Sequence, residues 1–233
     1  MRHALLAASL KEHLGLEFSP IALARVADPP SGVARLSERL PSACALWRRA
    51  ENAVFYADLA DHLGCPIGAM VMGFELPEAS QSELLGLVRT MCELTYIEEK
   101  EVSHIPKLAP QPGGVVYGPL ELFPIEPDLV LLWTSPAQAM LLQEATGGAI
   151  WSENDATSAF GRPACGALPI AHTRGTSVLS LGCIGMRTFT EISDGRCLAA
   201  LPARALAGLD SKLQQVARVN EKMRSFYVSR KQN

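Results

Sequence analysis

The chain has 233 residues, of which 48% are hydrophobic and 19% are charged, and its formal net charge is −3. So much apolar sequence excludes an intrinsically disordered protein, because the chain can bury enough apolar surface to fold. The slightly acidic balance argues against nucleic-acid binding, because no overall positive field attracts a phosphate backbone.

The sequence predicts no membrane span, because no run reaches the roughly 18 apolar residues that a spanning helix needs. The apolar run at residues 4–10 is followed directly by Lys11, Glu12 and His13, which favours an N-terminal helix over a signal peptide. We therefore expect a cytoplasmic protein without a membrane partner.

The first half of the chain predicts alternating helices and strands. Helices are expected at residues 2–15, 33–40 and 80–95, in a segment capped by Ser42, and after Cys65-Pro66. Strands are expected at residues 20–26 and 54–59. The Pro- and Gly-rich residues 109–114 predict a linker.

The second half predicts more strands. Strands are expected at residues 115–122, 128–134, 149–151, 177–181, 187–192 and 197–201, and helices at 136–145 and 206–227. The near-continuous apolar run at 128–134 is typical of a strand buried on both faces. Together the halves predict an α/β or α+β fold with mixed sheets covered by helices. Residues 1–108 and 115–233 are expected to form one compact unit.

Short matches suggest that the two halves are related. Ala43-Cys44 corresponds to Ala164-Cys165, and Gly64-Cys65 corresponds to Gly182-Cys183. We therefore expect residues 15–97 to superpose on residues 120–220 about a pseudo-twofold axis, which would bring four thiols toward one another.

The six cysteines are the main chemical signal. Disulfides are rare in a cytosolic chain, so metal binding and thiol chemistry are the functional alternatives. Cys92 and Cys197 lie in apolar patterns and are expected to be buried packing residues. No two cysteines lie within four residues of each other, so the close pairs of zinc ribbons and ferredoxins are absent from the sequence.

The remaining four cysteines allow three hypotheses. Cys44, Cys65, Cys165 and Cys183 could ligate one metal, act as separate reactive thiols, or simply fill the core. Cys65 is the best single reactive candidate, because Gly64 permits a tight turn and Pro66 begins a helix whose dipole stabilises a thiolate. Arg49 and Arg187 could hold an anionic partner. For His62, a surface or half-buried position is favoured over a role as base or ligand.

Several segments along most of the chain match one family pattern, namely residues 20–23, 64–69, 127–130, 136–140 and 180–187, together with Cys44, Arg49 and Ala164-Cys165. In these segments the chain resembles the uncharacterised ArCR family, also known as domain of unknown function 169. Met186 departs mildly from the family pattern, in which the residue before the arginine resembles serine more than methionine. The resemblance implies a cytosolic prokaryotic protein with four recurrent cysteines and no established activity.

These observations favour a metal or iron–sulfur protein with a redox or accessory role, in which the four cysteines ligate zinc or an iron–sulfur cluster. Its expected partner is a redox protein or an anionic small molecule. The alternative is a metal-free enzyme or small-ligand-binding module that uses Cys65. A structural or interaction protein with core cysteines is the third reading. The sequence leaves the oligomeric state open.

Overall fold

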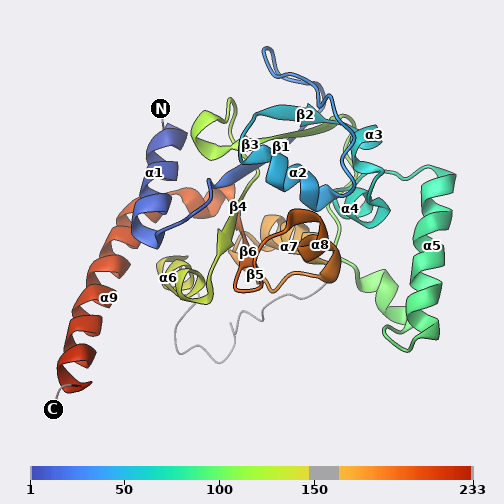
Figure 1. Cartoon of the computed structure of the whole chain (residues 1–233). Coiled ribbons are helices and arrows are strands. Elements are labelled where there is room, and N and C mark those ends of the chain that lie inside the picture. The colour runs from blue at the N-terminus through green and yellow to red at the C-terminus, as the bar shows by residue number, and fades with distance from the viewer. Residues whose placement is uncertain (1, 147–162, 232–233) are drawn as a thin grey trace.

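The computed structural model describes residues 2–146 and 163–231. Its centre is one sheet of six strands in the order β2-β3-β1-β4-β6-β5 (Figure 1). The strands are β1 (Ile21–Val26), β2 (Phe55–Ala57), β3 (Gly114–Pro119), β4 (Leu129–Thr134), β5 (Val178–Ser180) and β6 (Cys197–Pro202). The expectation of a mixed sheet is wrong, because every pairing between these strands is antiparallel.

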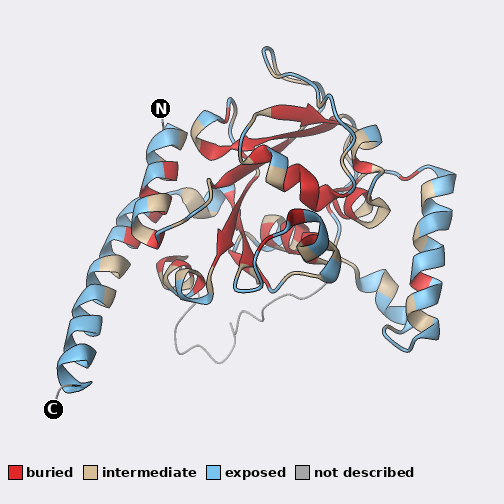
Figure 2. Ribbon diagram, in the orientation of Figure 1, coloured by how far each residue is buried: buried red, intermediate tan, exposed pale blue. Residues whose placement is uncertain are grey.

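Helices cover both faces of this sheet (Figure 2). Those packed on one face include α2 (Ala43–Ala50), α4 (Pro66–Val71), α7 (Ala167–Arg174) and α8 (Ile184–Thr190). The other face carries α1 (Arg2–Leu14), α6 (Pro136–Thr146) and the start of α9 (Leu209–Lys231). Further elements are α3 (Leu59–His62), α5 (Glu78–Glu93) and the short 3-10 helices η1 (Glu99–His104), η2 (Leu120–Leu122), η3 (Ala164–Gly166) and η4 (Ala203–Leu206).

Alternation along the central strands explains the two cores. In β1, Ile21 and Leu23 face the α2 side, whereas Ala22 and Ala24 face the α1 side. Successive side chains of a strand point to opposite faces, so a strand that is apolar throughout must be covered twice. The run at 128–134 meets this need as β4, which is buried along its whole length.

Two predicted elements differ in the structure. Of residues 187–192, predicted as a strand, the first four belong to α8 and the last two follow it. Within α8, the Thr188 and Thr190 hydroxyls donate to the carbonyls four residues earlier, at 2.8 and 2.7 Å. Residues 33–40 form no helix and instead run beside β2, where Leu36 N donates to Tyr56 O at 2.8 Å. The strand predicted at residues 149–151 lies outside the described residues.

Two helices project from the body at opposite ends of the view in Figure 1, namely α5 and the distal part of α9. None of the helices in the described ranges is long and apolar enough to cross a membrane.

Candidate functional site

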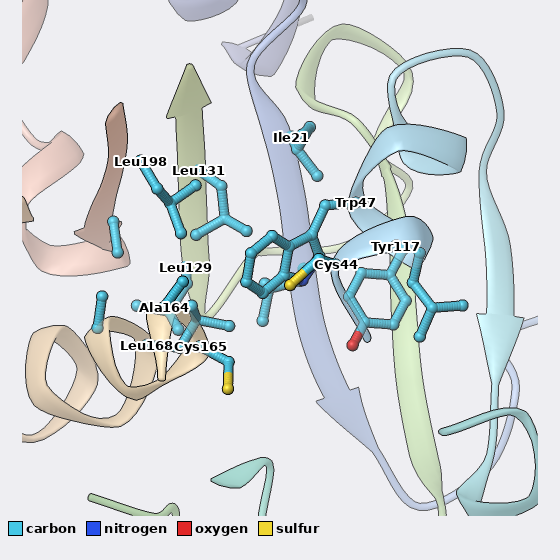
Figure 3. Packing of buried hydrophobic residues seen from close by; sticks show 14 of the residues in the cluster. Ile21, Cys44, Trp47, Tyr117, Leu129, Leu131, Ala164, Cys165, Leu168 and Leu198 are labelled. Atoms are coloured by element: carbon cyan, nitrogen blue, oxygen red, sulfur yellow. The ribbon is translucent and has the colours of Figure 1, made fainter. Parts of the chain in front are cut away.

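Cys44 and Cys165 lie in the core on the α2 side of the sheet. Ser42 caps α2 by accepting a hydrogen bond from Ala45 N at 3.1 Å, which places Cys44 in the first turn. Cys165 lies in η3, the short turn that leads into α7. Both belong to one apolar cluster with Trp47, Tyr117 and Leu129 (Figure 3). The sheet and its helices therefore bring together two thiols that are 121 positions apart in the sequence.

Cys65 and Cys183 occupy corresponding positions, each at the N-cap of a short helix. Both are partly exposed. Cys183 Sγ accepts a hydrogen bond from Met186 N at 3.4 Å. Cys65 makes no such capping bond. The helix-capping thiol interaction expected for Cys65 is therefore found at Cys183.

The four thiols lie within electrostatic range of one another. Burial raises the pKa of Cys44 well above its ordinary value, and a smaller rise comes from its neighbours Cys165, Cys183 and Cys65. Burial likewise raises the pKa of Cys165, and its named thiol neighbours are Cys65 and Cys183. Cys44 and Cys165 are therefore neutral thiols at neutral pH.

The expectation of a metal-binding, iron–sulfur site is wrong. Within residues 2–146 and 163–231, no group of three or more His, Cys, Asp or Glu side chains is arranged to hold a metal ion. The physical reason lies in the scaffold. A tetrathiolate site needs all four sulfurs about 2.3 Å from one point, and it needs thiolates. Here the four sulfurs come from four separate elements, namely α2, η3 and the starts of α4 and α8, and this scaffold does not arrange them as such a group.

Gly68 explains how α4 comes close to α2. A Cβ at this position would lie 2.5 Å from Cβ of Ala43 and 3.2 Å from Sγ of Cys65. Only a residue without a side chain leaves α4 this close to the helix that carries Cys44. The Gly-Cys-Pro-Ile-Gly segment therefore contributes close packing as well as a thiol.

The two arginines predicted to hold an anion are engaged in the structure. Arg49 Nε lies 2.7 Å from Oε1 of Glu38, near the surface. Arg187 donates to Leu181 O at 2.7 Å and to Ser193 O at 3.3 Å, so it ties together the loops around α8. An anionic ligand would have to compete with these partners.

His62 and Tyr117 form a buried polar pair beside the thiols. His62 is 1% exposed, and burial lowers its pKa to about 4. Its Nδ1 lies 2.6 Å from the Asp58 carbonyl oxygen, and its Nε2 lies 3.0 Å from the Tyr117 hydroxyl. Tyr117 has its pKa raised by burial first and then by Cys165 and Cys44. The expected surface or half-buried position of His62 is therefore wrong.

A second buried group, Glu51, was absent from the sequence prediction. Its carboxylate accepts a hydrogen bond from Trp133 Nε1 at 2.7 Å and pairs with Arg48 at 2.6 Å. Burial raises the pKa of Glu51, and these two donors act against that rise. Residue 51 follows α2 directly, so this group closes the helix that begins beside Cys44.

The two cysteines predicted as packing residues differ in their surroundings. Cys197 is buried in β6, as predicted. Cys92 lies partly exposed on the projecting helix α5, away from the sheet.

The family model of the uncharacterised ArCR proteins matches residues 9–209. No curated protein and no solved structure matches the chain. The matched range includes every strand of the sheet and all four neighbouring thiols, so the chain belongs to the uncharacterised ArCR family.

Proposed function

We propose that this protein is a metal-free, thiol-dependent enzyme or small-ligand-binding module in which Cys65 is the reactive residue. The observation that carries the proposal is the division of the four neighbouring thiols into two kinds. Cys44 and Cys165 are buried and neutral, whereas Cys65 and Cys183 reach the surface. A reactive thiol must be both accessible and able to ionise, and buried thiols in apolar surroundings are inert.

Cys65 is favoured over Cys183 because its sulfur makes no capping hydrogen bond, so the sulfur is available to a ligand. Cys183 is the second candidate, because its sulfur accepts a hydrogen bond from Met186 N, and such a bond favours a thiolate. Arg49 and Arg187 remain the proposed contacts for an anionic ligand. The proposal needs a reducing compartment, such as the cytoplasm, in which thiols stay free.

The proposed step is thiol exchange or addition. The Cys65 thiol loses its proton to solvent, and the thiolate attacks one sulfur of a small disulfide. A bond forms between Cys65 and that sulfur, and the second sulfur leaves as a thiolate. An electrophilic carbon ligand would instead form a thioether at the same atom.

We also infer that the two halves are related by a pseudo-twofold axis between β1 and β4. From the centre outwards the strands run β1-β3-β2 on one side and β4-β6-β5 on the other. Along the chain, Cys44 lies between β1 and β2, and Cys165 lies between β4 and β5. Cys65 follows β2, and Cys183 follows β5. On this reading the first half extends through β3, past the linker that the sequence predicts. Cys44→Ala and Cys165→Ala should then lower the free energy of unfolding by similar amounts, on the order of 1 kcal/mol in urea titrations.

The experiment titrates full-length protein, prepared without oxygen, with a limiting aromatic disulfide that releases a coloured thiolate. Cys92→Ser serves as the background, because Cys92 is also partly exposed. We expect one fast equivalent, located at Cys65 by peptide mass spectrometry. The fast phase should disappear in Cys65→Ser and persist in Cys183→Ser.

Two outcomes would overturn the proposal. A fast phase that survives in Cys65→Ser and disappears in Cys183→Ser would transfer the role to Cys183. The second outcome is stoichiometric iron or zinc in the same preparation. If removal of that metal makes all four thiols reactive together, a metal-free site is excluded.

A further inference from the structure

The helix α5 is an arm most of whose side chains, several apolar ones included, lie exposed in the described structure. Among its sixteen residues only Val88 is buried. Leu85 is 61% exposed, and Leu87 and Leu94 are exposed as well. A helix of this length is marginally stable in water unless an apolar face packs against something. The exposed apolar side chains of α5 are therefore typical of a surface that packs against a partner.

The distal part of α9 is a second arm of the same kind. Leu209 and Leu213 anchor the start of the helix in the core, whereas residues 221–231 are exposed throughout. The exposed apolar side chains beyond the body are Val219, Met223, Phe226, Tyr227 and Val228. Their spacing of three and four residues places most of them on one stripe.

The two arms carry opposite charge. Residues 218–231 of α9 contain five basic side chains and one acidic side chain, and the basic ones are Arg218, Lys222, Arg224, Arg230 and Lys231. Residues 78–101, which span α5 and the start of η1, contain six glutamates against Arg89 and Lys100. Each segment thus has a formal charge of magnitude four, although the whole chain carries only −3. Apart from one pair between Glu98 and Lys100, no ion pair within the described ranges involves these charges.

The arms of one chain cannot meet each other, because they leave the body at opposite ends (Figure 1). A second copy of the chain can cover the exposed apolar side chains of both α5 and α9. When α9 of one copy lies along α5 of its partner, a twofold axis places the partner's α9 along the first copy's α5. One helix pair of this length covers only part of the roughly 1,200 Å² that a stable interface buries, and the reciprocal pair doubles it. Closure by a twofold axis also avoids an open chain of molecules.

We propose that the protein forms a twofold-symmetric dimer in which the basic arm α9 of each copy docks on the acidic arm α5 of the other. The apolar stripes supply the contact, and the opposite charges select the partner helix and its orientation. This proposal is independent of the thiol chemistry, because the arms lie outside the sheet and its thiols.

The test compares the solution mass of the full chain with that of two charge-reversed variants, by light scattering after size exclusion. Glu83→Lys/Glu93→Lys reverses charge on α5, and Lys222→Glu/Arg224→Glu reverses charge on α9. The wild type should have the mass of a dimer at low salt and dissociate more readily in about 0.5 M salt. Each variant should fall to half that mass at a concentration at which the wild type is dimeric. Arg39→Glu, at an exposed position outside both arms, is the control and should remain dimeric.

Mixing the two monomeric variants gives the decisive result. In the mixed pair, one contact has the wild-type charges and the other has both charges reversed, so both contacts are attractive. An equimolar mixture should therefore recover the dimer mass, although neither variant does so alone. Circular dichroism verifies that each variant keeps its helices.

Three results would overturn the proposal. They are a wild type that stays monomeric at about 100 µM, a dimer that both reversals leave intact, and mixed variants that stay monomeric. A monomeric wild type whose α9 binds vesicles containing one-third phosphatidylserine would show that a lipid surface is the partner of the basic arm.

Discussion

The Tyr117 hydroxyl and His62 Nε2 lie 3.0 Å apart inside the core, and the direction of their hydrogen bond is fixed by what surrounds them. His62 Nδ1 faces the Asp58 carbonyl, which can only accept, so Nδ1 must carry the proton. Because burial keeps the imidazole neutral, Nε2 must accept, and Tyr117 must donate. Burial, rather than this hydrogen bond, is the main reason why the neighbouring Cys44 and Cys165 are neutral thiols.

Acid should destabilise the protein through His62. The pKa of His62 is about 4 in the folded state and about 6.5 in the unfolded chain. As the pH falls through this window, the unfolded state takes up a proton before the folded state does, so the free energy of unfolding falls. The full effect is about 3 kcal/mol. Urea titrations at several pH values should show this loss in the wild type.

The control is His62→Gln, which has no titrating group at this position. The difference between wild type and variant should change between pH 6.5 and 4 and be flat above pH 7. A difference that does not change with pH would contradict the burial of a neutral imidazole.

Tyr117→Phe tests the same pair by removing the donor alone. The ring should keep its stacking on Phe55, whose centroid lies 5.6 Å away, but His62 Nε2 would lose its partner. A buried acceptor left without a donor costs about 1–3 kcal/mol. Tyr56→Phe, on the other face of the same sheet, is the matched control and should change the free energy of unfolding by less than about 0.5 kcal/mol. Equal effects of the two variants would show that the Tyr117 hydroxyl contributes nothing.

The core of the fold was predictable where the signal is local. The apolar run at 128–134, the cap at Ser42 and the turn before Pro66 all depend on neighbours in the sequence, and each is found in the structure. The segment at 187–192 failed for the same reason. Thr188, Phe189 and Ile192 are residue types typical of a strand, but hydrogen bonds within α8 and packing against α2 favour the helix.

The site was less predictable, because its relationships join residues far apart in sequence. His62 and Tyr117 are separated by 55 positions, and Glu51 and Trp133 by 82. No spacing rule connects such pairs. Gly68 shows the same limit of sequence-based prediction in another way. Its position is evident from the sequence, but the close approach of α2 is evident only from the structure.

Gly68→Ala should disturb the thiol neighbourhood directly. The new methyl group would overlap Ala43 and touch Cys65 Sγ, so α4 must move away from α2. Such overpacking costs about 1–3 kcal/mol, and the reaction rate of Cys65 should change with it. Gly86→Ala is the matched control, because nothing lies within 4 Å of the added methyl group and alanine favours the helix by about 1 kcal/mol. Thermal unfolding should move in opposite directions in the two variants, and a neutral Gly68→Ala would show that the helices are not in close contact.

Glu51 should reveal whether its charge or its hydrogen bonds stabilise the fold. Burial raises its pKa, so the folded state favours the protonated form relative to the unfolded chain. The folded state then holds the proton to a higher pH than the unfolded chain does. The free energy of unfolding of the wild type, relative to Glu51→Gln, should therefore fall as the pH rises above 4.5.

The amide of Glu51→Gln keeps an acceptor for Trp133 Nε1, so this variant should be close to the wild type at pH 7. Glu51→Leu leaves the indole N–H without an acceptor and Arg48 without a partner, and it should cost about 1–3 kcal/mol more. Urea titrations of the three proteins between pH 4 and 8 separate the cases. If Glu51→Gln and Glu51→Leu lose the same free energy at every pH, the ion pair with Arg48 is the stabilising interaction, and the bond from Trp133 is not.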